Sequence, residues 1–311
     1  MFFEINSIKQ LFEFDDVCID DFAFRLHYKS TIIILIISSL FITSNQFIGE
    51  PISCIIDDIP ANFINSYCWT YGTFTNAEQE NGDIQPGVGS VNKGKSEIKY
   101  HKYYQWIYFT LLIQAILFYV PRYVWKIWEG GKMQKLSSNL NLVITEEGYK
   151  FEGKEIIINY MKKNMGTHND YALRFLLCLV LNLINIIAQL YFMDYFLNGE
   201  FSTYGLEVLK FINMEPEERV DPMSLVFPSM TKCSFNKYGP SGSIQYLDGL
   251  CVLPLNALNE IIYIFLWYWF HLVVFFTAVS IVYHILIYVF PYILMTLSTN
   301  MEQNGCSLVG I

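Results

Sequence analysis

Residues 261–290 read IIYIFLWYWFHLVVFFTAVSIVYHILIYVF, without a single Asp, Glu, Lys or Arg. A helix rises 1.5 Å per residue, so about 20 such residues cross the ~30 Å hydrocarbon core of a bilayer. Three further apolar blocks meet or approach that length, at 31–47, 104–124 and 171–196. Buried core helices are the alternative, but four such blocks are rare in soluble folds. The sequence therefore predicts an all-α membrane protein with four transmembrane helices.

The composition of the whole chain agrees with this class. Of 311 residues, 53% are hydrophobic and only 16% are charged, against roughly 25% charged in an ordinary soluble domain. The net charge of −9 argues against a nucleic-acid partner. The sequence contains no H-E-x-x-H, G-x-S-x-G or C-x-x-C motif. We therefore expect neither an enzyme nor a cofactor or metal site.

The Lys and Arg residues predict the orientation in the membrane. Residues 121–174 hold nine, whereas 46–103 and 197–260 hold four each. By the positive-inside rule the middle loop is cytoplasmic, and so are both termini. The predicted cytoplasmic segments are 1–30, 125–170 and a short tail at 291–311, and the predicted extracellular loops are 48–103 and 197–260.

Four of the seven cysteines fall in the two predicted outer loops. Cys54 and Cys68 are in the first loop, and Cys233 and Cys251 are in the second. An even number of cysteines on the oxidising side of the membrane indicates two disulfides, for which three pairings are open. Zinc is the competing interpretation, but neither loop has a C-x2-C pair or a nearby pair of histidines.

Several motifs identify a resemblance to a known family. They are Tyr103-Tyr104-Gln105-Trp106 followed by Pro121, together with FIGEPISCIIDDIP (47–60), QAILFYVPRYVWKIWEGG (114–131) and DGLCVLPLN (248–256). With two cysteines per outer loop, the chain resembles the innexins, the gap-junction proteins of invertebrates, and is most similar to those of insects. The similarity covers almost the whole chain.

The resemblance implies a channel subunit of the plasma membrane at a cell junction. Innexins form channels that pass ions and small molecules and dock head to head between cells. We expect six to eight subunits, with eight favoured, in a homo- or hetero-oligomer with other innexins. The resemblance also implies that Cys54 pairs with Cys251 and Cys68 with Cys233. The alternative is a four-span adhesion or scaffold protein that does not conduct.

Two polar groups are candidates for the pore lining. Ser39 and Thr43 are four residues apart in the first span, and so share one helix face. Asp15 and Asp16, with two more aspartates before that span, would bring negative charge to the cytoplasmic mouth of the pore. The alternatives are interhelical hydrogen bonds for the first pair and a solvated linker for the aspartates.

Pro121 predicts a bend in the second span, because proline lacks an N–H and clashes with the carbonyl four residues earlier. The bend is either a hinge or a fixed feature. The motif at 103–106 is open to a second interpretation, as an aromatic anchor at the membrane surface. Innexins usually carry a longer tail than 291–311, so a truncated chain, a divergent short form and a virus-borne innexin homologue are all open.

Overall fold

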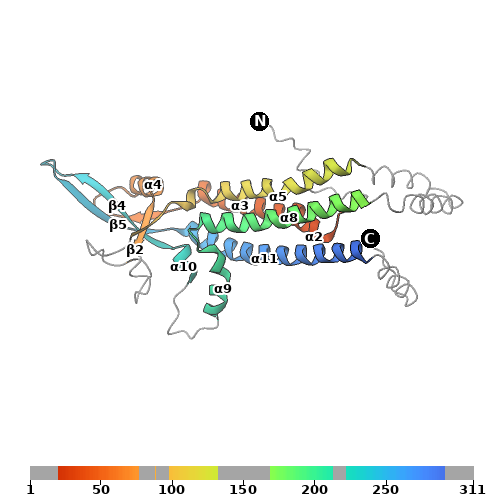
Figure 1. The fold of residues 1–311 in the computed structure, drawn as a ribbon. Helices are drawn as coiled ribbons and strands as arrows, with labels where there is room; N and C mark the ends of the chain where they lie inside the picture. The colour runs from red at the N-terminus through yellow and green to blue at the C-terminus, as the bar shows by residue number, and fades with distance from the viewer. Residues whose placement is uncertain (1–19, 77–87, 89–97, 132–168, 213–221, 291–311) are drawn as a thin grey trace, which may run out of the picture. The chain divides into compact units, whose positions relative to one another are not determined.

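The computed structural model describes residues 20–76, 88, 98–131, 169–212 and 222–290 (Figure 1). Asp15 and Asp16 lie outside the described residues, as do most of the expected middle loop and the expected tail at 291–311. Among the described residues, four helices are long and apolar enough to cross a membrane. Their bounds are Phe22–Ile48, Ile107–Glu129, Asp170–Phe196 and Pro254–Val289.

The first of these helices is composite and begins with a side-chain cap. It consists of α2 (Phe22–Arg25), a π-helical turn (Leu26–Thr31) and α3 (Ile32–Ile48). The Asp21 carboxylate accepts a hydrogen bond from the Phe22 N–H at 2.7 Å, which satisfies one donor at the helix N-terminus. The helix therefore starts well before the apolar block at 31–47.

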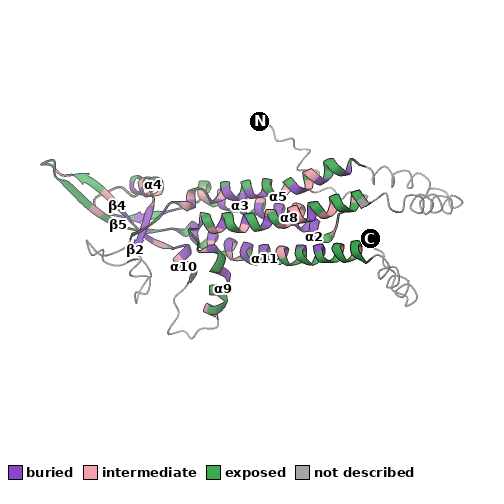
Figure 2. Cartoon of the chain, viewed as in Figure 1, coloured by how far each residue is buried: buried purple, intermediate pink, exposed green. Residues whose placement is uncertain are grey.

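The other long helices are α5 (Ile107–Glu129), α8 (Asn169–Phe196) and α11 (Pro254–Val289). Pro254 occupies the first helical position of α11, where proline's missing N–H costs nothing. Large apolar side chains are exposed along these helices, as the green ribbon in Figure 2 shows. Of the most apolar 18 residues of each helix, only 28% are buried in α8 and 17% in α11. Most of their surface is thus left for lipid or for other subunits.

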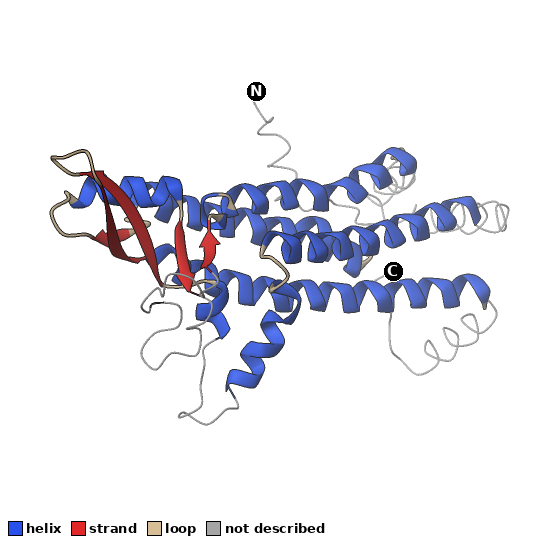
Figure 3. Cartoon of the chain, turned by 60° about the vertical axis from the view of Figure 1, so that its left-hand side comes forward, coloured by secondary structure: helices blue, strands red, loops and turns tan. Residues whose placement is uncertain are grey.

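The all-α expectation is wrong for the loops, which contain a five-stranded antiparallel sheet (Figure 3). The strand order is β1-β5-β4-β2-β3. In β4, Thr231 and Cys233 alternate with more exposed neighbours, which is the burial pattern of a strand with one covered face. The strands are β1 (Ser53–Ile55), β2 (Thr73–Asn76), β3 (Ile98–His101), β4 (Met230–Tyr238) and β5 (Ile244–Val252).

The chain divides into two compact units. Unit 1 comprises Met1–Ile32, Ile116–Ile186 and Val273–Ile311, and unit 2 comprises Ile33–Ala115 and Ile187–Leu272. Unit 2 holds the sheet and the short helices α4 (Ala61–Tyr71), α9 (Phe201–Ile212) and α10 (Pro222–Val226), with a 3-10 turn at Tyr103–Gln105.

Unit 1 has its own apolar core. The core residues come from α2, α5, α8 and α11, and Phe24 and Trp125 are almost fully buried. The Phe175 ring packs against both, with centroid distances of 5.9 Å and 5.1 Å. Aromatic side chains of three helices therefore hold this unit together.

Candidate functional site

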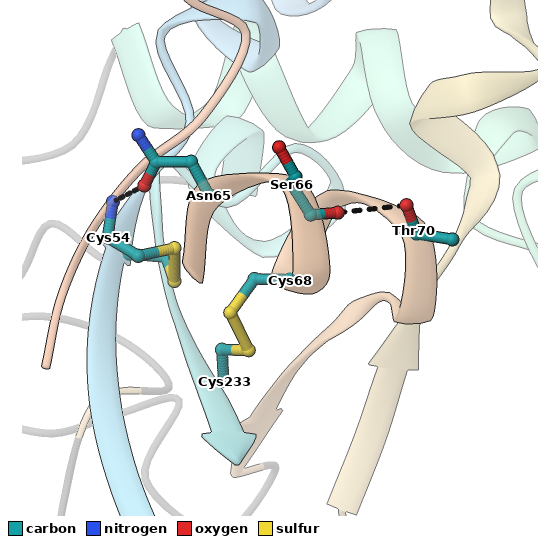
Figure 4. Close-up of a disulfide and its surroundings, with 7 residues drawn as sticks. Cys54, Asn65, Ser66, Cys68, Thr70 and Cys233 are labelled. Carbon is teal, nitrogen blue, oxygen red and sulfur yellow. Dashed lines mark hydrogen bonds between the residues drawn. A yellow bond between two sulfur atoms is a disulfide. The ribbon is translucent and has the colours of Figure 1, made fainter. Parts of the chain in front are cut away.

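Both expected outer loops meet in one disulfide-bonded module inside unit 2. Cys54 on β1 is bonded to Cys251 on β5. Cys68 on α4 is bonded to Cys233 on β4, as Figure 4 shows. This is the pairing that the resemblance implies. All four side chains are at most 3% exposed. Because the four sulfur atoms are consumed in disulfides, the module offers no thiolate pair to zinc.

Strand pairing and a side-chain hydrogen bond bring the cysteines together. Cys54 stands directly opposite Cys251 in the antiparallel ladder of β1 and β5. The Asn65 side chain on α4 accepts a hydrogen bond from the Cys54 N–H at 2.7 Å, as Figure 4 shows. This contact holds α4 beside β1, and α4 in turn carries Cys68. The module is therefore built from both loops and not from either one alone.

The 103–106 motif lies within this module. The Tyr103 hydroxyl donates to the Val226 carbonyl at 3.0 Å and accepts from the Asn256 side chain at 3.3 Å. Tyr103 thereby joins the end of the first loop to α10 and to the start of α11. The same Asn256 amide also donates to the Pro228 carbonyl at 2.8 Å.

The remaining three residues of the motif have different surroundings. Tyr104 is fully buried, with its ring 4.7 Å from that of Trp69 on α4. Gln105 donates a hydrogen bond to the Trp69 carbonyl. Trp106 is 58% exposed. The surface-anchor interpretation therefore suits Trp106, whereas the other three side chains hold the module together.

A buried histidine on β3 forms a side-chain hydrogen bond to β2. His101 Nε2 lies 2.8 Å from the Thr75 hydroxyl, and the imidazole is 2% exposed. Burial, and secondarily the positive charge of Lys99, lower the pKa of His101 to about 4. Lys99 itself forms an ion pair with Glu200, next to the start of α9. His101 is therefore neutral near pH 7.

The two candidates for pore lining on α3 have different environments. Ser39 is 2% exposed, and its hydroxyl donates to the Tyr108 carbonyl of α5 at 3.1 Å. It thus makes the interhelical hydrogen bond that was the alternative to a pore-facing role. Thr43 is partly exposed and donates to the Ser39 carbonyl at 2.7 Å. Beyond it, Ser44 and Asn45 are exposed.

A polar cluster in unit 1 was not expected from the sequence. Arg122 Nη1 lies 2.5 Å from the Asp20 carboxylate, which also accepts from the Tyr28 hydroxyl at 2.9 Å. The Arg122 guanidinium lies 4.7 Å from the centroid of the Tyr28 ring. The neighbouring Asp21 accepts a hydrogen bond from Ser280 on α11. These aspartates are therefore paired with side chains of the unit and do not stand free as a charged ring.

Pro121 lies inside α5, and the helix continues beyond it to Glu129. Proline cannot bond the carbonyl four residues earlier, which belongs to Leu117. The Asn185 side chain of α8 donates to this carbonyl at 3.1 Å. A neighbouring helix thus supplies the missing hydrogen bond, as the apolar interior of a membrane requires. The sequence signal for this contact is Asn185 itself, a polar residue inside the apolar block 171–196.

Four apolar helices and a disulfide-bonded module made from two separate loops define the architecture of a four-span, multi-pass membrane protein. The family model for innexins matches residues 20–307, and the chain belongs to the innexin family.

Similar insect proteins cover most of the chain. It is 53% identical to innexin inx2 of Drosophila melanogaster over 94% of this chain and 81% of that protein. It is 54% identical to innexin inx2 of Schistocerca americana over 92% of this chain and 81% of that protein. It is 43% identical to innexin shaking-B of Drosophila melanogaster over 92% of this chain and 78% of that protein. These relatives are insect proteins and lend no support to a viral origin.

Proposed function

We propose that the chain is a subunit of an intercellular gap-junction channel or hemichannel that passes ions and small molecules. The observation that carries the proposal is the loop module, in which two disulfides join segments 197 and 165 residues apart. A bridged module presents one preorganised surface, as docking between two cells requires, and preorganisation lowers the cost of association. Membership in the innexin family supports the same role. Family membership also agrees with the expectation that the protein is not an enzyme.

A conduit for metabolites requires several copies of this chain. Helices that pack closely around an apolar core leave no open centre, so the aqueous path lies between subunits. We propose a homo- or hetero-oligomer with other innexins, of six to eight subunits with eight favoured. Thr43 and the adjacent, exposed Ser44 are the side chains of α3 that we assign to the conduit. Ser39, one turn earlier on the same face, is instead covered by α5 through its hydrogen bond to the Tyr108 carbonyl.

The proposed location is the plasma membrane at a cell junction, with both termini and 125–170 cytoplasmic and the loops 48–103 and 197–260 extracellular. Amine labelling tests this orientation. An impermeant reagent added to intact cells should modify Lys93 and should leave Lys162 unmodified until the cells are opened. The reverse pattern would overturn the orientation.

Conduction is tested on a channel with a single new thiol. Thr43→Cys should be blocked by charged thiol reagents, with the block graded by reagent size, because the side chain is partly exposed. Ser39→Cys is the matched control on the same helix face, and it should be unaffected because that site is buried.

Dye transfer between paired cells is the second measurement of conduction. Junction formation without dye transfer or current would favour the alternative, adhesion without conduction. Current that is unchanged by confirmed modification at Thr43 would remove this face of α3 from the conduit.

A further inference from the structure

The short helix α9 is tied to the end of α8. Asn198 and Gly199 adopt positive φ values of 57° and 89°, so the chain turns sharply after α8 ends at Phe196. The Asp194 carboxylate, in the last turn of α8, accepts a hydrogen bond from the Ser202 N–H at 2.8 Å. A carboxylate is also favourable at a helix N-terminus. The start of α9 is therefore fixed at the level where α8 ends.

The same helix crosses α11 in close contact. Trp267 Nε1 donates to the Ser202 carbonyl at 3.3 Å, and the Tyr268 hydroxyl donates to the Gly205 carbonyl at 3.1 Å. A Cβ atom at Gly205 would lie 2.2 Å from the Trp267 ring, so a side chain there would force the helices apart. These contacts place the first turns of α9 beside Trp267 and Tyr268.

The contacts of α9 with α8 and α11 lie at one end of the apolar stretches that would cross the membrane. Counted back from the end of α11 at Val289, the residues to Trp269 extend about 31 Å, one hydrocarbon thickness; none of them is charged, and they lie within an uncharged run that begins at Ile261. The stretch of α8 between Arg174 and Asp194 is likewise uncharged. Asn256 and Asn259, earlier in α11, are fully buried polar residues of the loop module. The first part of α11 thus belongs to the module, and the membrane-crossing part starts near Trp267.

The outward side of α9 is amphipathic. Phe201, Tyr204 and Val208 are buried against unit 2. Leu206 and Leu209, three positions apart, are 52% and 44% exposed. The polar residues Thr203, Glu207 and Lys210 are exposed as well. At 100° per residue, the two leucines lie on one flank of the exposed surface, together with the exposed Ser202 of the first turn, and Thr203, Glu207 and Lys210 lie on the other.

We propose that α9 is an interfacial helix that binds the phospholipid surface on the side of the membrane that holds the loop module. Leu206 and Leu209 enter the boundary between headgroups and acyl chains, while Glu207 and Lys210 stay in water, where Lys210 meets lipid phosphates. Tyr195, 84% exposed in the last turn of α8, fits the aromatic belt at the same level. The inference rests on the proposed function only in requiring that the four helices cross a membrane.

The test uses the full chain in phosphatidylcholine vesicles, with an environment-sensitive fluorophore on one introduced cysteine. The cysteines outside the two disulfides are first replaced by serine. Leu206→Cys is the test position, and Glu207→Cys is its matched neighbour on the polar flank. Phe275→Cys, a 63% exposed position within α11, reports membrane insertion itself.

A lipid with a spin label near its headgroup should quench the Leu206 fluorophore about twofold or more above the Glu207 fluorophore, and aqueous iodide should do the reverse. Equal iodide quenching at both sites would place α9 in water and overturn the proposal. Shielding of the Leu206 site from both quenchers would show a protein cover, such as a second copy of the chain, and would also overturn it. Loss of lipid quenching at Phe275 would instead refute the membrane-spanning architecture that the proposed function requires.

Discussion

Replacing one member of the Asp20–Arg122 ion pair should destabilise the protein more than replacing both. The two side chains are 3% and 18% exposed, so neither charge is well hydrated. Leaving one charge of a buried pair without its partner costs ~3–5 kcal/mol, whereas neutral replacements at both positions are often tolerated. Arg122→Met leaves the Asp20 carboxylate with the Tyr28 hydroxyl, and we expect a loss of about 3–4 kcal/mol.

The Asp20→Asn variant should lose less. The Arg122 guanidinium keeps its place over the Tyr28 ring at 4.7 Å, and such a contact is worth ~0.5–2 kcal/mol. We therefore expect a loss of about 2–3 kcal/mol for Asp20→Asn and about 1 kcal/mol for the double variant. The negative coupling between the two substitutions is the signature of the ion pair.

The assay is thermal unfolding of the full chain in lipid nanodiscs at fixed protein and lipid concentrations. At about 2 °C per kcal/mol for a chain of this size, the midpoint should fall by about 6–8 °C for Arg122→Met and 4–6 °C for Asp20→Asn. The double variant should fall by about 2 °C. Arg25→Met, at an exposed position of α2, is the control and should shift the midpoint by less than about 1 °C. A double variant that loses the sum of the two single losses would refute the reasoning.

Three further predictions concern other parts of the chain. Lowering the pH should destabilise the loop module, because the pKa of His101 is about 4 in the folded state and 6.5 in the unfolded state, so the unfolded state binds the proton first. The free energy of unfolding should fall by about 2 kcal/mol between neutral pH and pH 5. His101→Gln should flatten this part of the plot of melting temperature against pH. Asn185→Leu should cost about 0.5–1.5 kcal/mol by removing the donor to the Leu117 carbonyl. It should cost less when combined with Pro121→Ala, which restores the backbone donor. Equal losses in both backgrounds, measured by thermal unfolding, would contradict this. Peptide mapping without reduction should recover Cys68 joined to Cys233, and links confined to one loop would contradict the inter-loop module.

The four long helices could be predicted because their signal is local. Apolar length alone identifies them, and each block is longer than a buried core helix needs. The starts of the first and last helices were harder to predict, since they depend on the Asp21 cap and on Pro254, which lie outside the apolar blocks. Because capping residues are polar, a prediction from hydropathy assigns them to loops and misses the true start of the helix.

The sheet and the paired side chains could not be predicted in the same way. β1 has only three residues, and its partner β5 lies almost 200 residues further along the chain. The resemblance supplied the disulfide pairing, which spacing alone left open among three choices. Ser39 shows the limit of a helix-face argument: the spacing placed it beside Thr43, but only the position of α5 decides which of them is covered. Asp20 and Arg122 are likewise 102 residues apart and meet only after the helices pack.

The inter-loop disulfides also determine the order in which the protein can mature. Cys54 must wait for Cys251, which is synthesised 197 residues later, a delay of about 10–40 s at ribosomal rates of ~5–20 residues per second. In the proposed orientation the first loop carries two reactive thiols in the oxidising compartment throughout that interval, and a bond between Cys54 and Cys68 is then the nearest wrong pairing. Correct pairing then requires that both thiols stay free until the second loop is made, or that a temporary bond is exchanged. A chain that stops before the second loop has no partner for Cys54 or Cys68 and cannot complete the module.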